Sequence, residues 1–60
     1  MEPIMLIYKM EEKSVVMTIE HAGTLASMVA MCREFDYPYE IYNYSEENGF
    51  QRTACWPPKI

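Results

Sequence analysis

Glycine, cysteine and histidine are scarce in this 60-residue chain, and their scarcity excludes several kinds of site. The two glycines, Gly23 and Gly49, lie too far apart to form a glycine-rich loop that holds a phosphate. The two cysteines, Cys32 and Cys55, have the spacing of neither a zinc motif nor a redox motif, and we expect both to remain unbridged thiols. The sequence therefore predicts no cofactor.

Catalytic residues are also few. The single histidine, His21, precedes Cys32 by about three turns of a predicted helix, roughly 16 Å, which is too far for a catalytic dyad. The best carboxylates for a metal site are two pairs in predicted turns: Glu11 with Glu12, and Glu46 with Glu47. Because charges at hairpin tips are normally solvated, we predict no catalytic residue, no metal site and no enzyme.

Positive charge is also scarce, and long apolar runs are absent from the sequence. Nine acidic residues against five basic ones give a net charge of -4, which repels phosphate backbones. No apolar run approaches the roughly 20 residues that a membrane span needs, and the first residues lack the basic segment of a signal peptide. We therefore expect a soluble cytoplasmic protein that contacts no membrane and for which nucleic acid is a poor partner.

Apolar residues, by contrast, are abundant. Half of the chain is hydrophobic and 13% is aromatic, which is too apolar for a disordered protein. We expect one domain over residues 1–60, with residues 57–60 as a short tail because neither Pro57 nor Pro58 can donate to a sheet. A chain of this size buries only about 60% of its unfolded surface, so a partner or a second copy is expected to complete the core.

The segment from His21 to Asp36 is typical of an amphipathic helix. At 3.6 residues per turn, one stripe carries these apolar residues: Leu25, Met28, Val29, Cys32 and Phe35. Thr24 is a plausible N-cap, although the helix could begin anywhere between His21 and Thr24. Because Pro38 disfavours the α conformation at Tyr37, we predict that the helix ends near Asp36.

Alternating apolar residues on both sides of this segment predict four β-strands. Residues 3–10 are apolar on both faces, as expected of a central strand, and residues 14–20 have one polar face. Residues 39–56 contain two more strand-like runs. The order is therefore ββαββ, and right-handed connections favour the strand order 2-1-3-4. We predict a single small α+β domain with one helix packed on a four-stranded antiparallel sheet.

The dipeptide Asn48-Gly49 predicts a two-residue turn in the last hairpin. That turn sets the following provisional pairs: Tyr44 with Thr53, Tyr42 with Cys55, and Ile41 with Trp56. Two groups of side chains would then lie on opposite faces: Ile41, Ala54 and Trp56 on one, and Tyr42, Tyr44, Thr53 and Cys55 on the other. A loop of three or four residues would shift the pairing, and the sequence leaves that alternative open.

The tyrosines of this hairpin are the main candidates for a binding site. On a sheet face that the helix does not cover, Tyr42 and Tyr44 would be exposed, and tyrosine is enriched in protein interfaces. We predict that both act as anchors for a partner, with a charged rim formed by Glu40, Glu46 and Glu47. Cross-strand tyrosine pairs that only stabilise the hairpin are an equally weighted interpretation.

The outer side of the predicted helix is a second candidate. It carries small residues where a solvent-facing helix usually carries lysine and glutamate: Gly23, Ala26, Ser27 and Ala30. Small residues allow two helices to approach closely. We therefore predict a homodimer through this face, while a plain solvent-facing surface explains the same residues.

Two functional hypotheses follow. The first is a small acidic, non-enzymatic protein-binding module whose partner is a larger protein with a basic patch. Such proteins are common among bacteriophage and mobile-element proteins, so this one could be an inhibitor that presents carboxylates to a host nucleic-acid-handling protein. The alternative is a single-stranded nucleic-acid-binding protein that stacks bases on Tyr42 and Tyr44. The surrounding acids disfavour it, because base-stacking platforms normally lie in a positive groove.

Overall fold

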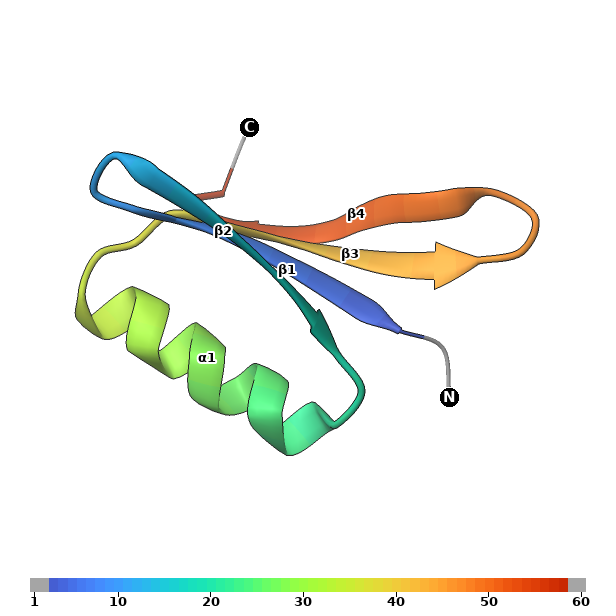
Figure 1. The fold of residues 1–60 in the computed structure, drawn as a ribbon, viewed down its shortest axis with the longest axis horizontal. Helices are drawn as coiled ribbons and strands as arrows, with labels where there is room; N and C mark the ends of the chain where they lie inside the picture. The colour runs from blue at the N-terminus through green and yellow to red at the C-terminus, as the bar shows by residue number, and fades with distance from the viewer. Residues whose placement is uncertain (1–2, 59–60) are drawn as a thin grey trace.

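The computed structural model of the chain describes residues 3–58 and shows one helix packed on one face of a four-stranded sheet (Figure 1). The elements in chain order are β1 (Ile4–Met10), β2 (Lys13–Ile19), α1 (Ala22–Glu34), β3 (Tyr39–Ser45) and β4 (Gly49–Trp56). The strand order is β2-β1-β3-β4, and every neighbouring pair is antiparallel. The predicted fold class, element order and strand order are confirmed. Of the predicted tail, residues 57 and 58 follow β4, and residues 59 and 60 lie outside the described residues.

Alternation along β1 separates a covered face of the sheet from an uncovered one. Leu6 and Tyr8 are buried on the side of α1, so Met5 and Ile7 lie on the other side. Pairing extends this division, because residues directly opposite each other on neighbouring strands share a face. The side toward the helix also contains Ile41, which pairs with Leu6. β1 is paired on both edges, but the helix covers only the face of Leu6 and Tyr8, so the apolar residues Met5 and Ile7 remain on the uncovered face.

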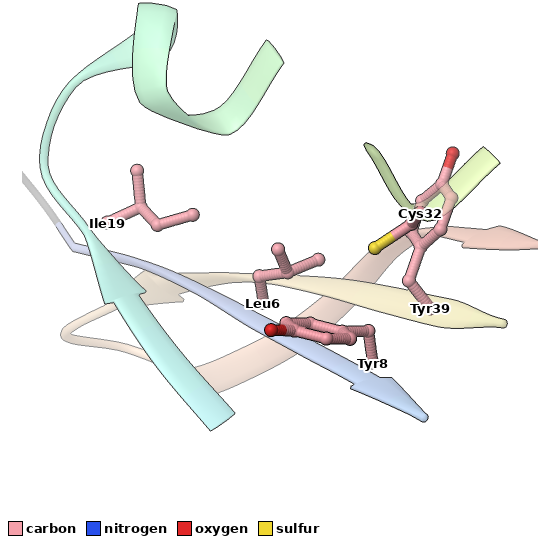
Figure 2. Packing of buried hydrophobic residues seen from close by; sticks show 5 residues of the cluster. All are labelled: Leu6, Tyr8, Ile19, Cys32 and Tyr39. Carbon is pink, nitrogen blue, oxygen red and sulfur yellow. The ribbon is translucent and has the colours of Figure 1, made fainter. Parts of the chain in front are cut away.

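The buried core on the helix side is small. It consists of Leu6, Tyr8, Ile19, Cys32 and Tyr39, and Figure 2 shows Leu6 between Ile19 on one side and Cys32 and Tyr39 on the other. The surface of the chain is 4580 Å² for 7.1 kDa, whereas a folded monomer of that mass typically exposes about 4,100 Å². The fold therefore leaves more surface in water than a typical monomer does.

The helix begins where the sequence suggested but without the predicted cap. His21 occupies the N-cap position in an extended conformation, and its side chain makes no capping hydrogen bond. The backbone N–H groups of Thr24 and Leu25 both donate to the His21 carbonyl. Thr24 is thus inside the first turn, and its assignment as N-cap is wrong.

The helix ends at Glu34, two residues before the predicted end. Asp36 takes the left-handed conformation with φ of 58°, and two hydrogen bonds close the end: Tyr37 N–H to the Cys32 carbonyl at 2.7 Å and Asp36 N–H to the Arg33 carbonyl at 3.4 Å. These are the two bonds of a Schellman motif. The reversal turns Phe35 outward, where it is 58% exposed and stacks on Tyr37. Its predicted place on the buried stripe is wrong, while Leu25, Met28, Val29 and Cys32 do pack on the core.

The first hairpin has a two-residue loop of Glu11 and Glu12, since Met10 pairs with Lys13. Glu11 takes a left-handed conformation with φ of 56°. The pairing then runs without interruption from Met10 opposite Lys13 to Ile4 opposite Ile19. β2 is therefore a regular strand along its whole length.

The second hairpin differs from the provisional register. Ser45 pairs with Gly49, so the loop contains three residues, 46–48, and Gly49 starts β4 with φ of 70°. Tyr44 then lies opposite Phe50, and Tyr42 opposite Arg52, rather than opposite Thr53 and Cys55. The loop is closed by the Ser45 hydroxyl, which accepts a hydrogen bond from the Asn48 backbone N–H at 3.1 Å. The three-residue alternative, which the sequence left open, is the one that forms.

A β-bulge follows in β4 and changes the position of Thr53. The register shifts between Ile41 and Tyr42, so Thr53 is the extra residue on the opposite strand. Its hydroxyl donates to the Asn43 side-chain oxygen at 2.8 Å, which places it on the face of Asn43, and not beside the tyrosines as predicted. Beyond the bulge, Ala54 and Trp56 face the helix side together with Ile41, as predicted. The predicted pair of Ile41 with Trp56 is wrong, because Ile41 lies opposite Ala54 and Trp56 lies opposite Tyr39.

Candidate functional site

The sheet face opposite α1 is the most extensive candidate site, and we call it the open face. Figure 1 shows that the helix covers one side of the sheet only, and that the β3–β4 hairpin extends beyond the helix. From the pairing, the open face carries these side chains: Met5, Ile7 and Lys9 of β1; Ser14, Val16 and Thr18 of β2; Glu40, Tyr42 and Tyr44 of β3; Phe50, Arg52 and Cys55 of β4. Half of them are large and apolar or aromatic, which is unusual for a sheet face in water.

Aromatic residues gather at the end of this face near the β3–β4 loop. The rings of Tyr44 and Phe50 contact each other with centroids 5.2 Å apart and planes tilted by 58°, a favourable arrangement for an aromatic pair. Phe50 nevertheless remains 46% exposed. Tyr42 lies two residues before Tyr44 on the same face, opposite Met5. Tyr42 and Tyr44 share this face with Cys55, as predicted, whereas Thr53 does not, and Phe50 is an additional member. Both tyrosines are half-buried and not exposed as predicted.

Glu40 organises the middle of the open face. Its Oε2 atom accepts a hydrogen bond from the Tyr42 hydroxyl at 2.9 Å and an ion-paired one from Arg52 Nη1 at 3.3 Å. The hydrogen bond to Glu40 is the main cause that raises the pKa of Tyr42 above its usual value of 10.0, with desolvation and the charge of Glu40 adding to it. Tyr42 is therefore a neutral donor at physiological pH. Glu40, which the sequence placed in a charged rim, lies between two polar neighbours instead.

A hollow of about 380 Å³ indents the other end of the open face, beside the C-terminal prolines. Ile7, Cys55 and Pro57 give it apolar walls, while Lys9 and Glu40 contribute one charge of each sign. Small-molecule pockets commonly enclose 300–1,000 Å³, but this hollow is open on one side.

The acidic loop borders the aromatic end. Glu46 and Glu47 are exposed in the turn between β3 and β4, next to the Tyr44–Phe50 pair. They therefore remain at the edge of the open face, where a charged rim was predicted.

The helix residues predicted for self-association lie apart from the open face. Gly23, Ala26, Ser27 and Ala30 are all exposed on α1, on the other side of the sheet. The end of α1 is instead tied to β4, because the Arg33 guanidinium lies 5.5 Å from the centre of the Trp56 ring and that ring stacks on Tyr39.

The described residues contain few groups suited to chemistry. Within residues 3–58, no three histidine, cysteine, aspartate or glutamate side chains are placed to hold a metal ion. Both cysteines are unbridged, as predicted; Cys32 is buried in the core and Cys55 is half-buried on the open face. No helix in the described part of the chain is long and apolar enough to cross a membrane.

Several members of the site were missed at the level of sequence. Met5 and Ile7 were read only as the second face of a central strand, and Val16 only as part of a polar face. Their signal was available, because an apolar residue on the outer face of a two-layer domain has no layer to cover it. The hollow forms where the chain turns at Pro57, and no pattern in the sequence predicts it.

No family model, curated protein or solved structure matches this chain. The geometry of the open face is therefore the basis for a functional assignment. Its components are an aromatic cluster, a hollow and an acidic border on one side of a thin two-layer domain.

Proposed function

We propose that this protein is a non-enzymatic binding module that docks a larger, basic protein against its open face. The observation that carries the proposal is the uncovered sheet face itself, where Phe50 is 46% exposed and Met5, Ile7 and Tyr44 are half-buried with no second layer over them. The chain as a whole also has more exposed surface than its mass requires. Large apolar patches of this kind mark interaction sites in soluble proteins. A partner would supply the second layer that the fold lacks.

Tyr42 and Tyr44 serve as the anchors in this proposal. Both are rigid aromatic side chains with a polar end, which can be desolvated at an interface while the hydroxyl stays hydrogen-bonded. Tyr42 already has its hydroxyl bonded to Glu40, so it is oriented before the partner arrives. An oriented side chain loses less conformational freedom on binding.

Charge favours a basic partner. The chain carries a net charge of -4, and Glu46 and Glu47 lie exposed at the border of the open face. Complementary charge steers association and selects among partners more than it adds affinity. Exposed carboxylates can bind the surface with which a nucleic-acid-handling protein normally binds phosphates. The specific form of the proposal is therefore a phage or mobile-element inhibitor of such a host protein.

Single-stranded nucleic acid remains the weaker candidate for the same tyrosines. Arg52, the cation nearest to them, is paired with Glu40. Phosphates would have to displace that carboxylate, and the acidic border would repel them.

The test is capture from a bacterial lysate with the wild-type protein and two matched variants. Tyr44→Ala removes an open-face anchor, whereas Gln51→Ala changes an exposed residue of the neighbouring strand on the opposite face, since Gln51 pairs with Asn43. We expect one basic protein to be recovered by wild type and Gln51→Ala and lost with Tyr44→Ala, unaffected by nuclease treatment. Recovery that disappears with nuclease would support the nucleic-acid candidate instead, and equal recovery by all three proteins would remove the open face from consideration.

A further inference from the structure

The outer edge of β2 differs from the other edge of the sheet. β4, at the far side, is interrupted by the bulge at Thr53 and is followed by Pro57. β2 has neither feature, and Lys13 is its one charged residue. Proteins normally protect an edge strand with charges, prolines or bulges, because its unpaired backbone groups can bind another strand. β2 is thus the edge that is open to pairing.

The hairpin geometry shows which backbone groups β2 presents. Met10 and Lys13 close the two-residue turn and form a hydrogen-bonded pair, after which bonded and non-bonded pairs alternate along an antiparallel ladder. The even-numbered residues of β2 therefore direct their N–H and C=O groups away from β1. These residues are Ser14, Val16 and Thr18, whose side chains all lie on the open face.

The sequence of β2 is nearly symmetric about Val16. Ser14 and Thr18, two residues away on either side, both carry a β-hydroxyl, and Val15 and Met17 are both apolar. Symmetry of this kind is what an isologous interface requires, because residue i of one copy then meets a compatible residue of the other. An unrelated partner strand would place no such demand on the sequence.

We propose that a second copy of this chain pairs with β2 in antiparallel register, with Val16 opposite Val16 at the two-fold axis. Ser14 then lies opposite Thr18, Val15 lies opposite Met17, and the outward backbone groups form about six hydrogen bonds between the copies. The pairing joins two four-stranded sheets into one sheet of eight strands. It also covers Val16, which is 61% exposed and is the most exposed large apolar side chain in the described residues.

Charge permits contact along β2, as it would along β4, which carries Arg52 and no acid. Two chains of net charge -4 repel each other, so contact is easiest where acids are fewest, and β2 contains Lys13 and no acid. Glu12 and Glu20 flank the strand and meet each other at both ends of the paired segment. Because added salt screens both this local repulsion and the net repulsion, the dimer should become tighter as salt rises.

The same arrangement brings the two helices onto one side of the joined sheet. Both strands at the new junction are β2, the strand that α1 follows in the chain and whose backbone it approaches. Packed helices lie about 8–10 Å apart, and the distance depends on the side chains at the contact. The small exposed residues Gly23, Ala26 and Ala30 would reduce steric conflict between the copies there.

Sedimentation equilibrium over a range of protein and sodium chloride concentrations tests the proposal. Wild type should reach twice the 7.1 kDa chain mass with rising concentration, and more readily at high salt. Val16→Lys places two like charges opposite each other at the two-fold axis and should weaken self-association by at least about tenfold. Gln51→Lys is the control, because it adds the same charge to an exposed position on β4 and should leave self-association unchanged.

A second variant, Thr18→Pro, removes an outward N–H and leaves the ladder to β1 intact, so it should also produce a monomer. Circular dichroism must show each variant folded. Val16→Lys acts through a side chain and Thr18→Pro through a backbone N–H, so dissociation of either folded variant supports the proposal. A wild type that stays monomeric at high concentration and high salt would overturn the proposal. So would a dimer that survives both β2 changes but is lost with Ala26→Glu, since it would form through the helix alone.

Discussion

At the scale of single residues, Glu40 determines how the centre of the open face is charged. Its carboxylate receives the Tyr42 hydroxyl and the Arg52 guanidinium, which leaves a compact polar group between the aromatic cluster and the hollow. This network could not be predicted from sequence, because Tyr42 and Arg52 are cross-strand neighbours only in the three-residue loop register. The tyrosines themselves could be predicted, since alternation in β3 is independent of the loop.

The network makes a prediction about titration. Tyr42 has a pKa above 10.0 in the folded protein, so its contribution to stability is complete below pH 10 and is lost as pH rises through the folded pKa. Glu40→Gln removes the carboxylate and should return the Tyr42 pKa toward its ordinary value. Residue-specific NMR titration of the tyrosine rings checks this, and an unchanged Tyr42 midpoint in the variant would show that Glu40 does not hold the hydroxyl.

The two cysteines should differ in reactivity. Cys32 is completely buried, and burial raises the pKa of its thiol, whereas Cys55 is half-buried on the open face. Since the thiolate is the reactive species, a neutral alkylating reagent should modify Cys55 first and Cys32 only when the protein unfolds. Mass spectrometry of timed samples, with Cys55→Ser as the control, measures the order. Equal rates in the native protein would contradict the position of Cys32 in the core.

At the scale of elements, the sequence predicted each strand and the helix, and it placed the ends of β1 and β2 within one residue. It did not predict the helix end or the loop of the last hairpin correctly. Pro38 correctly indicated that the helix stops before Tyr37, yet the Schellman motif ends it at Glu34 by placing Asp36 in a left-handed conformation. A glycine usually occupies that position, so its absence concealed the signal. Asn48-Gly49 misled for a related reason, because a glycine with positive φ serves both a two-residue turn and the residue after a three-residue loop.

The helix end gives a prediction about stability. Asp36→Gly relieves the left-handed strain of a non-glycine residue and should stabilise the fold by about 1 kcal/mol, which corresponds to roughly 4–8 °C in Tm for a domain of this size. Glu34→Gly, in the last helical position, is the matched control and should destabilise by a similar amount. Thermal unfolding followed by circular dichroism measures both. A loss of stability in Asp36→Gly would mean that the Asp36 side chain contributes more than its backbone strain removes.

At the scale of the whole molecule, a single helix covers one face of the sheet and leaves the other face bare. The fold class was predictable because hydrophobic periodicity changes from 3.6 to 2 at both ends of α1. The bare face was predictable in part, through Tyr42 and Tyr44, but the hollow and the position of Phe50 depend on the three-residue loop and on Pro57. Small domains that expose one layer in this way commonly gain stability from what they bind.

Salt dependence would separate the two proposed associations of the molecule. Docking of a basic protein on the acidic border should weaken as salt rises, because attraction between opposite charges is screened. Pairing of two copies through β2 should strengthen, because the copies repel each other. The two events can therefore be measured independently in the same protein.

The affinity of the captured basic protein for wild type, Tyr44→Ala and Gln51→Ala, measured by calorimetry, tests the proposed function most directly. Truncating a central aromatic anchor typically costs 2 kcal/mol or more, so we expect Tyr44→Ala to bind at least about thirtyfold more weakly. Gln51→Ala, on the opposite face of the same hairpin, should bind as wild type does. Unchanged affinity for a folded Tyr44→Ala, with loss of binding in Gln51→Ala, would contradict docking on the open face and place the partner on the helix side of the sheet.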